Sequence, residues 1–168
     1  LRVGAAFGME YKNEAFARNP HIARGLVELF ELRFDPARSP DPAAEEALVA
    51  SIRADLDRVK SLDEDRILRA QLRLVLATLR TNAFRPDRAY LSFKFASAVV
   101  PDMPKPFPLY EIFVYSPAME GVHLRGGKVA RGGIRWSDRK EEYRTEILGL
   151  MKAQMVKNAV IVPVGSKG

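Results

Sequence analysis

Residues 131–168 read RGGIRWSDRKEEYRTEILGLMKAQMVKNAVIVPVGSKG, and this stretch decides the fold class that the sequence predicts. Apolar side chains recur at helical spacing between residues 139 and 157, which predicts an amphipathic helix. Residues 159–164, AVIVPV, follow as a short, wholly apolar run that is typical of a strand buried on both faces of a sheet. A helix followed at once by such a strand predicts a mixed α/β fold.

The same stretch carries three cations at the ends of its expected elements. Lys167 lies between glycines directly after the expected strand, where backbone and substrate can approach closely. Lys157 ends the expected helix, and Arg131 stands beside a glycine pair. Burial and neighbouring like charge lower the pKa of a lysine, so Lys167 could act as an acid, a base or a nucleophile. If the three cations converge, they could hold one small acid.

Each cation also has a plainer interpretation, which the pattern alone leaves open. Lys167 can be a solvated loop residue, and Lys157 can be a cation favourably placed at a helix C-terminus. Arg131 and the glycine pairs on either side of it can belong to hairpin turns that carry solvated charges. Neither GGKVARGG nor GSKG matches a dinucleotide fingerprint or a P-loop, so nucleotide binding by these segments is disfavoured.

Composition argues against several other kinds of site. The 168 residues are 47% apolar, which suits one domain or two subdomains, and no apolar run reaches the length of about eighteen residues that a membrane span needs. With no cysteine and two distant histidines, His21 and His123, neither a disulfide framework nor a transition-metal site is expected. The chain opens with Leu1 in a segment too polar for a secretory signal, so we expect it to be cut from something longer.

The net charge of +6 is unevenly distributed, and residues 125–140 hold much of the basic excess. Such a region suits either nucleic acid or a small anionic substrate. An alternative function is therefore a basic, non-catalytic interaction module that binds nucleic acid or acidic partners. Trp136 is the one aromatic residue of this basic stretch, which disfavours a surface built on base stacking.

The first half of the chain is expected to be helical. Residues Asn19, Asp41 and Ser61 are expected helix caps, each followed by apolar residues at helical spacing. The predicted helices cover residues 19–35, 41–60 and 61–82. Together they would form a helical layer or bundle.

After residue 86 the periodicity changes to that of strands. Strands are predicted for LSFKF at 91–95, YEIFVY at 110–115 and GVHLRG at 121–126. We therefore expect a helical segment over residues 1–86, followed over residues 87–168 by the beginning of an α/β domain with a mixed sheet.

The segment from EIFVYSPAMEGVHLRGG through KVARGGIRWSDRKEEYRTEILGLMKAQMVKNAVIVPVGSKG closely resembles the large bacterial NAD-specific glutamate dehydrogenases. The resemblance extends back through LSFKF and NPHIARGLVELFELRFDP, so it covers essentially the whole chain. The last forty residues also resemble the shorter hexameric glutamate dehydrogenases. The resemblance to the large bacterial enzymes implies that residues 87–168 begin the catalytic, substrate-binding domain of an enzyme that converts L-glutamate to 2-oxoglutarate and ammonium.

The resemblance implies a role for each of the three cations. Lys167 matches the catalytic lysine, which helps to activate the water that attacks the imino acid, and Lys157 matches a lysine that binds a substrate carboxylate. Arg131 stands where the hexameric enzymes have a lysine for the other carboxylate. An arginine there could bind the carboxylate through two parallel hydrogen bonds.

The resemblance also implies what this chain does not contain. The aspartate used for proton transfer has no matching position, and the domain that binds NAD would lie beyond Gly168. The chain alone is therefore not expected to be a complete dehydrogenase. The family implies a cytoplasmic homo-oligomer that binds neither nucleic acid nor membrane.

Overall fold

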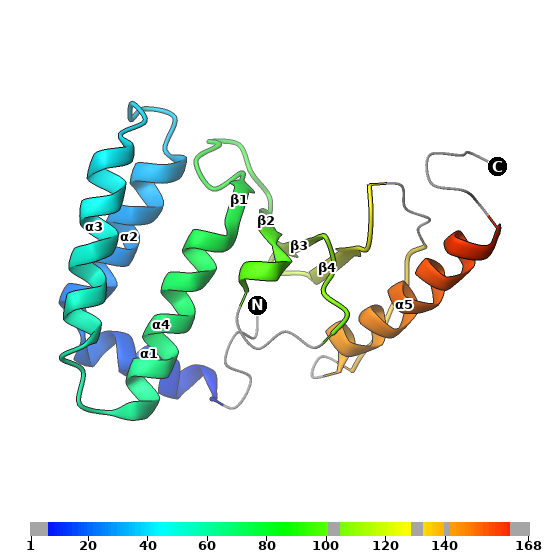
Figure 1. Ribbon diagram of the computed structural model, residues 1–168, viewed down its shortest axis with the longest axis horizontal. Coiled ribbons are helices and arrows are strands. Elements are labelled where there is room, and N and C mark those ends of the chain that lie inside the picture. Colours follow the sequence, from blue (N-terminus) through cyan, green and yellow to red (C-terminus); the bar gives the residue numbers. More distant parts are fainter. Residues whose placement is uncertain (1–6, 101–104, 129–132, 140–141, 162–168) are drawn as a thin grey trace.

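The computed structural model describes residues 7–100, 105–128, 133–139 and 142–161, with side chains described as far as Met155. Four helices lie at one end of the chain, a four-stranded sheet lies in the middle, and one long helix lies at the other end (Figure 1). This arrangement confirms the predicted mixed α/β class, with helices first and the sheet after them.

The helical part consists of four elements, of which three were expected from the sequence. They are α1 (Met9–Arg18), α2 (Pro20–Phe34), α3 (Pro42–Leu56) and α4 (Leu62–Ala77). Asp41 and Ser61 cap α3 and α4 as predicted, because their side chains accept hydrogen bonds from the backbone N–H of Ala44 and Glu64. Helix α1 was not expected.

Helices α2, α3 and α4 enclose the largest hydrophobic core among the described residues. Its buried members are Ile22, Leu26, Leu29, Ile52, Leu56, Leu68 and Leu72. Because α2 supplies three of these side chains and α3 and α4 supply the others, none of the three helices can bury its apolar face alone.

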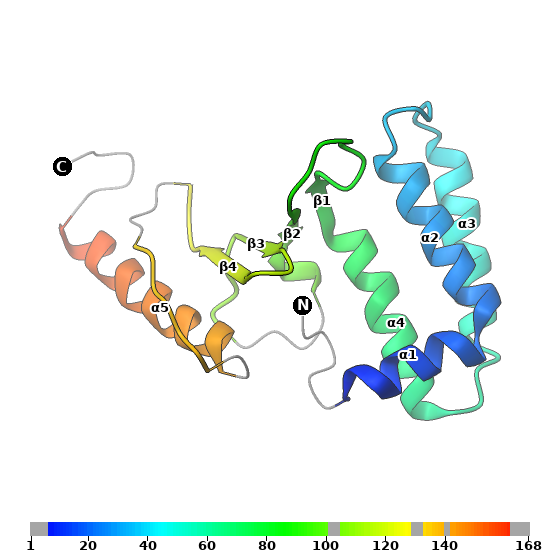
Figure 2. The same ribbon diagram turned by 180° about the vertical axis from the view of Figure 1, so that it is seen from behind.

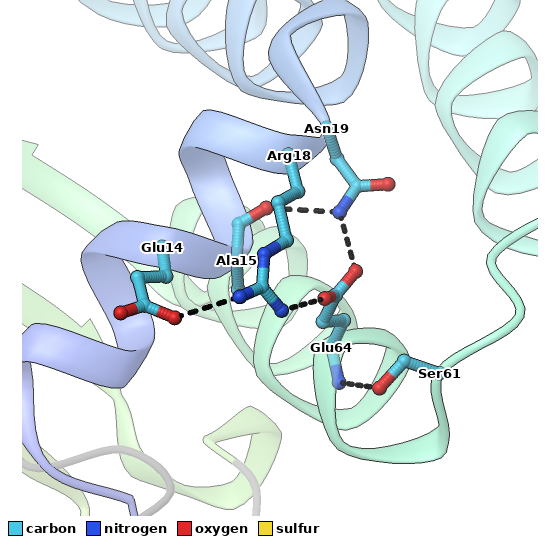
Figure 3. Close-up of polar contacts among 6 residues, drawn as sticks. All are labelled: Glu14, Ala15, Arg18, Asn19, Ser61 and Glu64. Atoms are coloured by element: carbon cyan, nitrogen blue, oxygen red, sulfur yellow. Dashed lines mark hydrogen bonds and ion pairs between the residues drawn. The ribbon is translucent and has the colours of Figure 1, made fainter.

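A polar junction fastens α1 and the start of α2 to α4 (Figure 3). The expected cap residue Asn19 makes no capping hydrogen bond, and its Nδ2 instead donates to the carbonyl oxygen of Ala15 at 2.9 Å and to Oε2 of Glu64 at 2.9 Å. Arg18 donates to Oε1 of the same Glu64 at 3.2 Å and to Glu14 at 3.0 Å. Glu64 therefore accepts hydrogen bonds from two consecutive residues at the joint between α1 and α2.

Helix α4 ends earlier than predicted, at Ala77 rather than near Asn82. Thr78 Oγ1 donates to the carbonyl oxygen of Leu74 at 2.8 Å, and Thr78 already pairs with Phe95 of the sheet. Residues Thr78–Thr81 form strand β1. Residues 78–81 form a strand instead of extending the helix because the partner strand supplies backbone hydrogen bonds, and β-branched Thr78 and Thr81 suit an extended chain.

The sheet has the order β1-β2-β3-β4, with all neighbouring strands antiparallel. The three predicted strands correspond to β2 (Leu91–Ala96), β3 (Tyr110–Tyr115) and β4 (Glu120–Arg125). A 3₁₀ turn, η1 (Ser97–Val99), follows β2 and contacts α4. One face of the sheet carries the buried row Phe95, Glu111 and Leu124, and α4 packs over Phe95 with Ala70 and Ala77.

The last helix, α5 (Tyr143–Ile161), differs from the prediction at both of its ends. It begins four residues later than expected, and residues 159–161 of the predicted AVIVPV strand belong to the helix. The first residue after Tyr143 that breaks a helix is Pro163, so the apolar run can continue the helix up to this point. Residues 162–164 lie outside the described residues, and the described strands make no parallel pair that would give a mixed sheet.

Helix α4 contacts both the helical core and the sheet: its Leu68 and Leu72 lie in the helical core, and its Ala70 and Ala77 pack against Phe95 of the sheet. The division of the chain at residue 86 stays a prediction.

None of the helices in the described ranges is long and apolar enough to cross a membrane.

Candidate functional site

Of the three predicted site residues, Lys157 is the one whose backbone the structure describes, and it lies in α5. Arg131 and Lys167 lie outside the described residues, and the side chain of Lys157 does as well. The backbone of Lys157 is helical, and α5 continues for four residues after it. The prediction that Lys157 ends its helix is therefore wrong, because the helix runs on through residues that were expected to form a strand.

Strand β4 and helix α5 form one packed unit at the far edge of the sheet, as Figure 2 shows from behind. The contact is apolar: Leu124 of β4 is buried against Leu148 and Met151 of α5. Val122 and Ile147 add to it from the same two elements. The strand that leads toward Arg131 and the helix that contains Lys157 are thus held together by a small hydrophobic core.

The turn after β4 is held close to α5. A Cβ atom added to Gly126 would lie 2.7 Å from Sδ and 2.9 Å from Cγ of Met155, which is closer than carbon and sulfur atoms can approach. Arg125 closes the turn, because its guanidinium donates to the carbonyl oxygens of Gly127 and Lys128. The glycine at position 126 therefore has a structural purpose, namely close packing of the turn against the helix.

A buried ion pair makes the second connection between α5 and the sheet. Glu111 of β3 has an exposed fraction of 0%, and the guanidinium of Arg144, in the first turn of α5, grips it. The Nε atom lies 3.0 Å from Oε1 and 3.2 Å from Oε2, and Nη2 lies 2.8 Å from Oε2. Two nitrogens on one carboxylate form the forked arrangement that makes arginine pairs directional.

Sequence reasoning missed this pair, although one signal for it was present. Glu111 interrupts the otherwise aromatic and β-branched run YEIFVY, and its neighbours across the sheet are the apolar residues Phe95 and Leu124. A carboxylate on the covered face of a strand needs a cationic partner from the covering element. The sequence alone does not say which of the many arginines provides it.

The basic stretch that suggested an interaction module is only partly available for binding. Arg125 is occupied with the turn, and Arg139 lies within 3.7 Å of Glu142 and 3.4 Å of Glu146. Two large apolar residues in this stretch are exposed, Ile134 at 97% and Trp136 at 87%.

Two hollows among the described residues lie in the helical part. One has a volume of about 280 Å³ at the turn between α3 and α4, where Arg69 pairs with Asp57 and Asp65 at 2.7 Å each. These contacts raise the pKa of Arg69, chiefly through the hydrogen bond from its guanidinium to Asp57. Since both acids are engaged, this hollow offers little to a charged ligand.

Neither a metal nor a dinucleotide has a site that the described residues could build. They contain no cluster of three or more histidine, cysteine, aspartate or glutamate side chains. Dinucleotides bind at the carboxyl ends of parallel strands joined by helices, whereas the described strands are antiparallel. The described part of the chain does not fit NAD.

Comparison with known proteins relates nearly the whole chain to one family. Residues 51–168 match the model of the family described as bacterial NAD-glutamate dehydrogenase, catalytic domain, and residues 2–36 match glutamate dehydrogenase, helical motif 3.

Three bacterial relatives show the extent of the similarity. The chain is 54% identical to the NAD-specific glutamate dehydrogenase of Pseudomonas aeruginosa over 177 aligned residues, which cover 100% of the chain and 11% of that protein. It is 54% identical to the protein of the same name from Halomonas elongata, and the alignment covers 96% of the chain and 10% of that protein. The NAD-specific glutamate dehydrogenase of Mycobacterium tuberculosis is 50% identical, and the alignment covers 99% of the chain and 11% of that protein. The chain thus spans about a tenth of the length of these relatives.

Proposed function

Because this chain belongs to the bacterial NAD-glutamate dehydrogenase family, we propose that it forms the substrate-binding part of an enzyme that oxidises L-glutamate with NAD to 2-oxoglutarate and ammonium. The match of residues 51–168 to the catalytic domain carries this proposal. NAD would bind to a part of the enzyme other than the described residues, which have no dinucleotide site.

Two cations of this chain would orient the substrate. Glutamate and 2-oxoglutarate each carry two carboxylates, and a reaction at Cα needs both of them held in place. We assign one carboxylate to Arg131 and one to Lys157. The assignment is supported by the packing of β4 on α5, because β4 ends six residues before Arg131 in the sequence and Lys157 lies within α5.

Lys167 would assist the hydrolytic step. After oxidation at Cα the substrate is an imino acid, and water must attack its carbon before ammonium can leave. A lysine beside this carbon can polarise the water and stabilise the charge that develops in the transition state. The protein thus supplies position and positive charge.

The assignment of Lys167 is tested by Lys167→Ala in the full-length enzyme. We expect kcat to fall by about 10²-fold or more while the KM for glutamate changes little, as for a group that acts mainly in the transition state. Lys152→Ala is the control, since Lys152 is an exposed lysine on α5. Near-normal turnover of Lys167→Ala would refute the catalytic role.

The assignment of Lys157 is tested by Lys157→Ala in the same assay. Loss of a carboxylate contact should raise the KM for glutamate by about 10-fold or more, with a smaller effect on the KM for NAD. If glutamate binds as tightly as in the Lys152→Ala control, Lys157 does not hold a carboxylate.

The proposal extends to the organisation of the whole enzyme. Following the family, we place it in the cytoplasm as a homo-oligomer, with residues 1–86 as a helical segment and the catalytic domain beginning at residue 87. Light scattering of the full-length enzyme tests the oligomer, and a mass equal to one chain would contradict it.

A further inference from the structure

The ion pair between Glu111 and Arg144 is placed where apolar packing alone would suffice. Glu111 lies between Phe95 and Leu124 on the covered face of the sheet, and all three side chains are buried. Burying a carboxylate requires a well-aligned partner, and buried ion pairs can often be replaced by apolar residues without loss of stability. Stability therefore gives little reason for a glutamate at this position, whereas orientation gives a clear one.

The ion pair between Glu111 and Arg144 fixes the orientation of α5 on the sheet, which the apolar contacts of this helix do not do. Leu124, Leu148 and Met151 form a small apolar contact, over which a helix can slide or rotate at little cost. The forked contact of Arg144 with both carboxylate oxygens fixes where the first turn of α5 lies and how the helix is rotated about its axis. Glu111 is a suitable anchor because β3 is an inner strand, paired on both sides by β2 and β4.

Small movements at Arg144 would become large at Lys157. Thirteen residues separate the two positions in α5, which corresponds to about 20 Å along a helix. A tilt of about 5° around the first turn would displace Lys157 by about 1.7 Å over this length. Displacements of about 1 Å can reduce the effect of a substrate-orienting group by about 10²-fold.

We propose that Glu111 and Arg144 are positioning residues, which fix the orientation of α5 and thereby hold Lys157 at the substrate carboxylate. This inference rests on the proposed function, because it needs Lys157 to bind substrate. Neither residue touches the substrate itself. Their effect reaches the substrate through the helix.

The first test removes both charges and keeps the packing. The double variant Glu111→Leu/Arg144→Met in the full-length enzyme should unfold at a temperature close to that of the wild type, because apolar residues of similar size replace the pair. We expect its KM for glutamate to rise by about 5-fold to 30-fold and its KM for NAD to stay within about 2-fold. A KM for glutamate equal to that of the wild type would overturn the inference.

Arg139→Met is the control for the loss of an arginine near the start of α5. Arg139 lies just before α5 and pairs with Glu142 and Glu146, but it does not reach the sheet strand that carries Glu111. Its KM for glutamate should stay within about 2-fold of the wild type. A rise as large as that of the double variant would mean that loss of any arginine near the start of α5 is enough to cause the effect, and would count against the inference.

A double-mutant cycle with Lys157→Ala separates this inference from the proposed function. If the pair acts through Lys157, adding Glu111→Leu/Arg144→Met to Lys157→Ala should raise the KM for glutamate by less than about 2-fold. If the effects multiply in full, the inference fails while the role of Lys157 stands. If Lys157→Ala alone leaves the KM unchanged, the role of Lys157 fails, and the inference fails with it.

Discussion

At the scale of single residues, the pKa of Glu64 links the junction of α1, α2 and α4 to pH. The hydrogen bond from Asn19 lowers the pKa of this carboxyl below its ordinary value of 4.5, and the contacts with Arg18 lower it further against the opposing effect of burial. A carboxyl group with a lowered pKa in the folded state stabilises that state above pH 4.5, and this contribution is lost as the pH falls through the folded-state pKa.

We therefore expect Glu64→Gln to lower the free energy of unfolding at pH 7 and to do so less as the pH falls toward about 3. Urea unfolding of the chain at a series of pH values measures the difference between variant and wild type. Glu28→Gln, at an exposed position of α2, is the control. A difference that stays constant across the pH range would contradict the link to the charge of Glu64.

Two glycines near α5 should respond in opposite ways to the same substitution. Gly126→Ala should destabilise the chain slightly, by about 0.5 kcal/mol, because its Cβ would displace the flexible, 40% exposed side chain of Met155. Gly149→Ala should stabilise it by about 0.5–1 kcal/mol, because a Cβ there meets nothing within 4 Å and alanine favours the helix. Thermal unfolding checks both, and the double variant Gly126→Ala/Met155→Ala should recover part of the loss. Equal effects of the two glycine substitutions would contradict the close packing of Gly126 against Met155 and the open space at Gly149.

At the scale of elements, α2 shows a sharp difference between its buried and exposed sides. Leu29 has an exposed fraction of 0% and Val27 one of 58%. Leu29→Ala should therefore lower the free energy of unfolding by about 2–5 kcal/mol, whereas Val27→Ala should change it by about 0.5 kcal/mol or less. Denaturant unfolding of the two variants provides the comparison, and similar losses would mean that α2 is not packed as described.

The sequence predicted the elements well where the evidence was local and less well where distant contacts decide. Strong apolar rows and caps at Asp41 and Ser61 are local signals, and they predict α3 and α4 without any tertiary contact. Helix α1 was missed because its buried side chains are Lys12 and Ala15, which form no apolar row. The change from helix to strand at Thr78 depends on pairing with Phe95, seventeen residues further along the chain.

At the scale of the whole molecule, the charge distribution bears on the alternative function as a nucleic-acid binder. Part of the basic excess is neutralised within the chain, since Arg139 pairs with Glu142 and Glu146. The guanidinium of Arg125 keeps its charge, but its N–H groups already donate to carbonyl oxygens of its own turn. We expect no saturable binding of a short DNA duplex at about 0.15 M salt, measured by fluorescence anisotropy. Tight binding with a steep dependence on salt would favour the alternative over a glutamate site.

For the candidate site, the sequence predicts the residues that would bind substrate but not the ion pair that fixes the helix beside them. The sequence pattern and the resemblance predict Arg131, Lys157 and Lys167, and the resemblance implies a role for each, which stays a prediction. The pair of Glu111 and Arg144 escaped prediction because its members lie 33 residues apart and meet only when α5 folds onto the sheet. Pattern finds residues that repeat along one element, whereas a cross-element contact needs the tertiary structure.

The helical core also has a consequence for synthesis on the ribosome. Leu29 of α2 leaves the exit tunnel before Leu72 of α4, and both belong to the same core. Leu72 lies 43 positions after Leu29, and the ribosome takes about 2–9 s to add these residues at about 5–20 residues per second. For this interval α2 has an uncovered apolar face, so nascent chains of this length should be bound by a ribosome-associated chaperone and released once α4 has emerged.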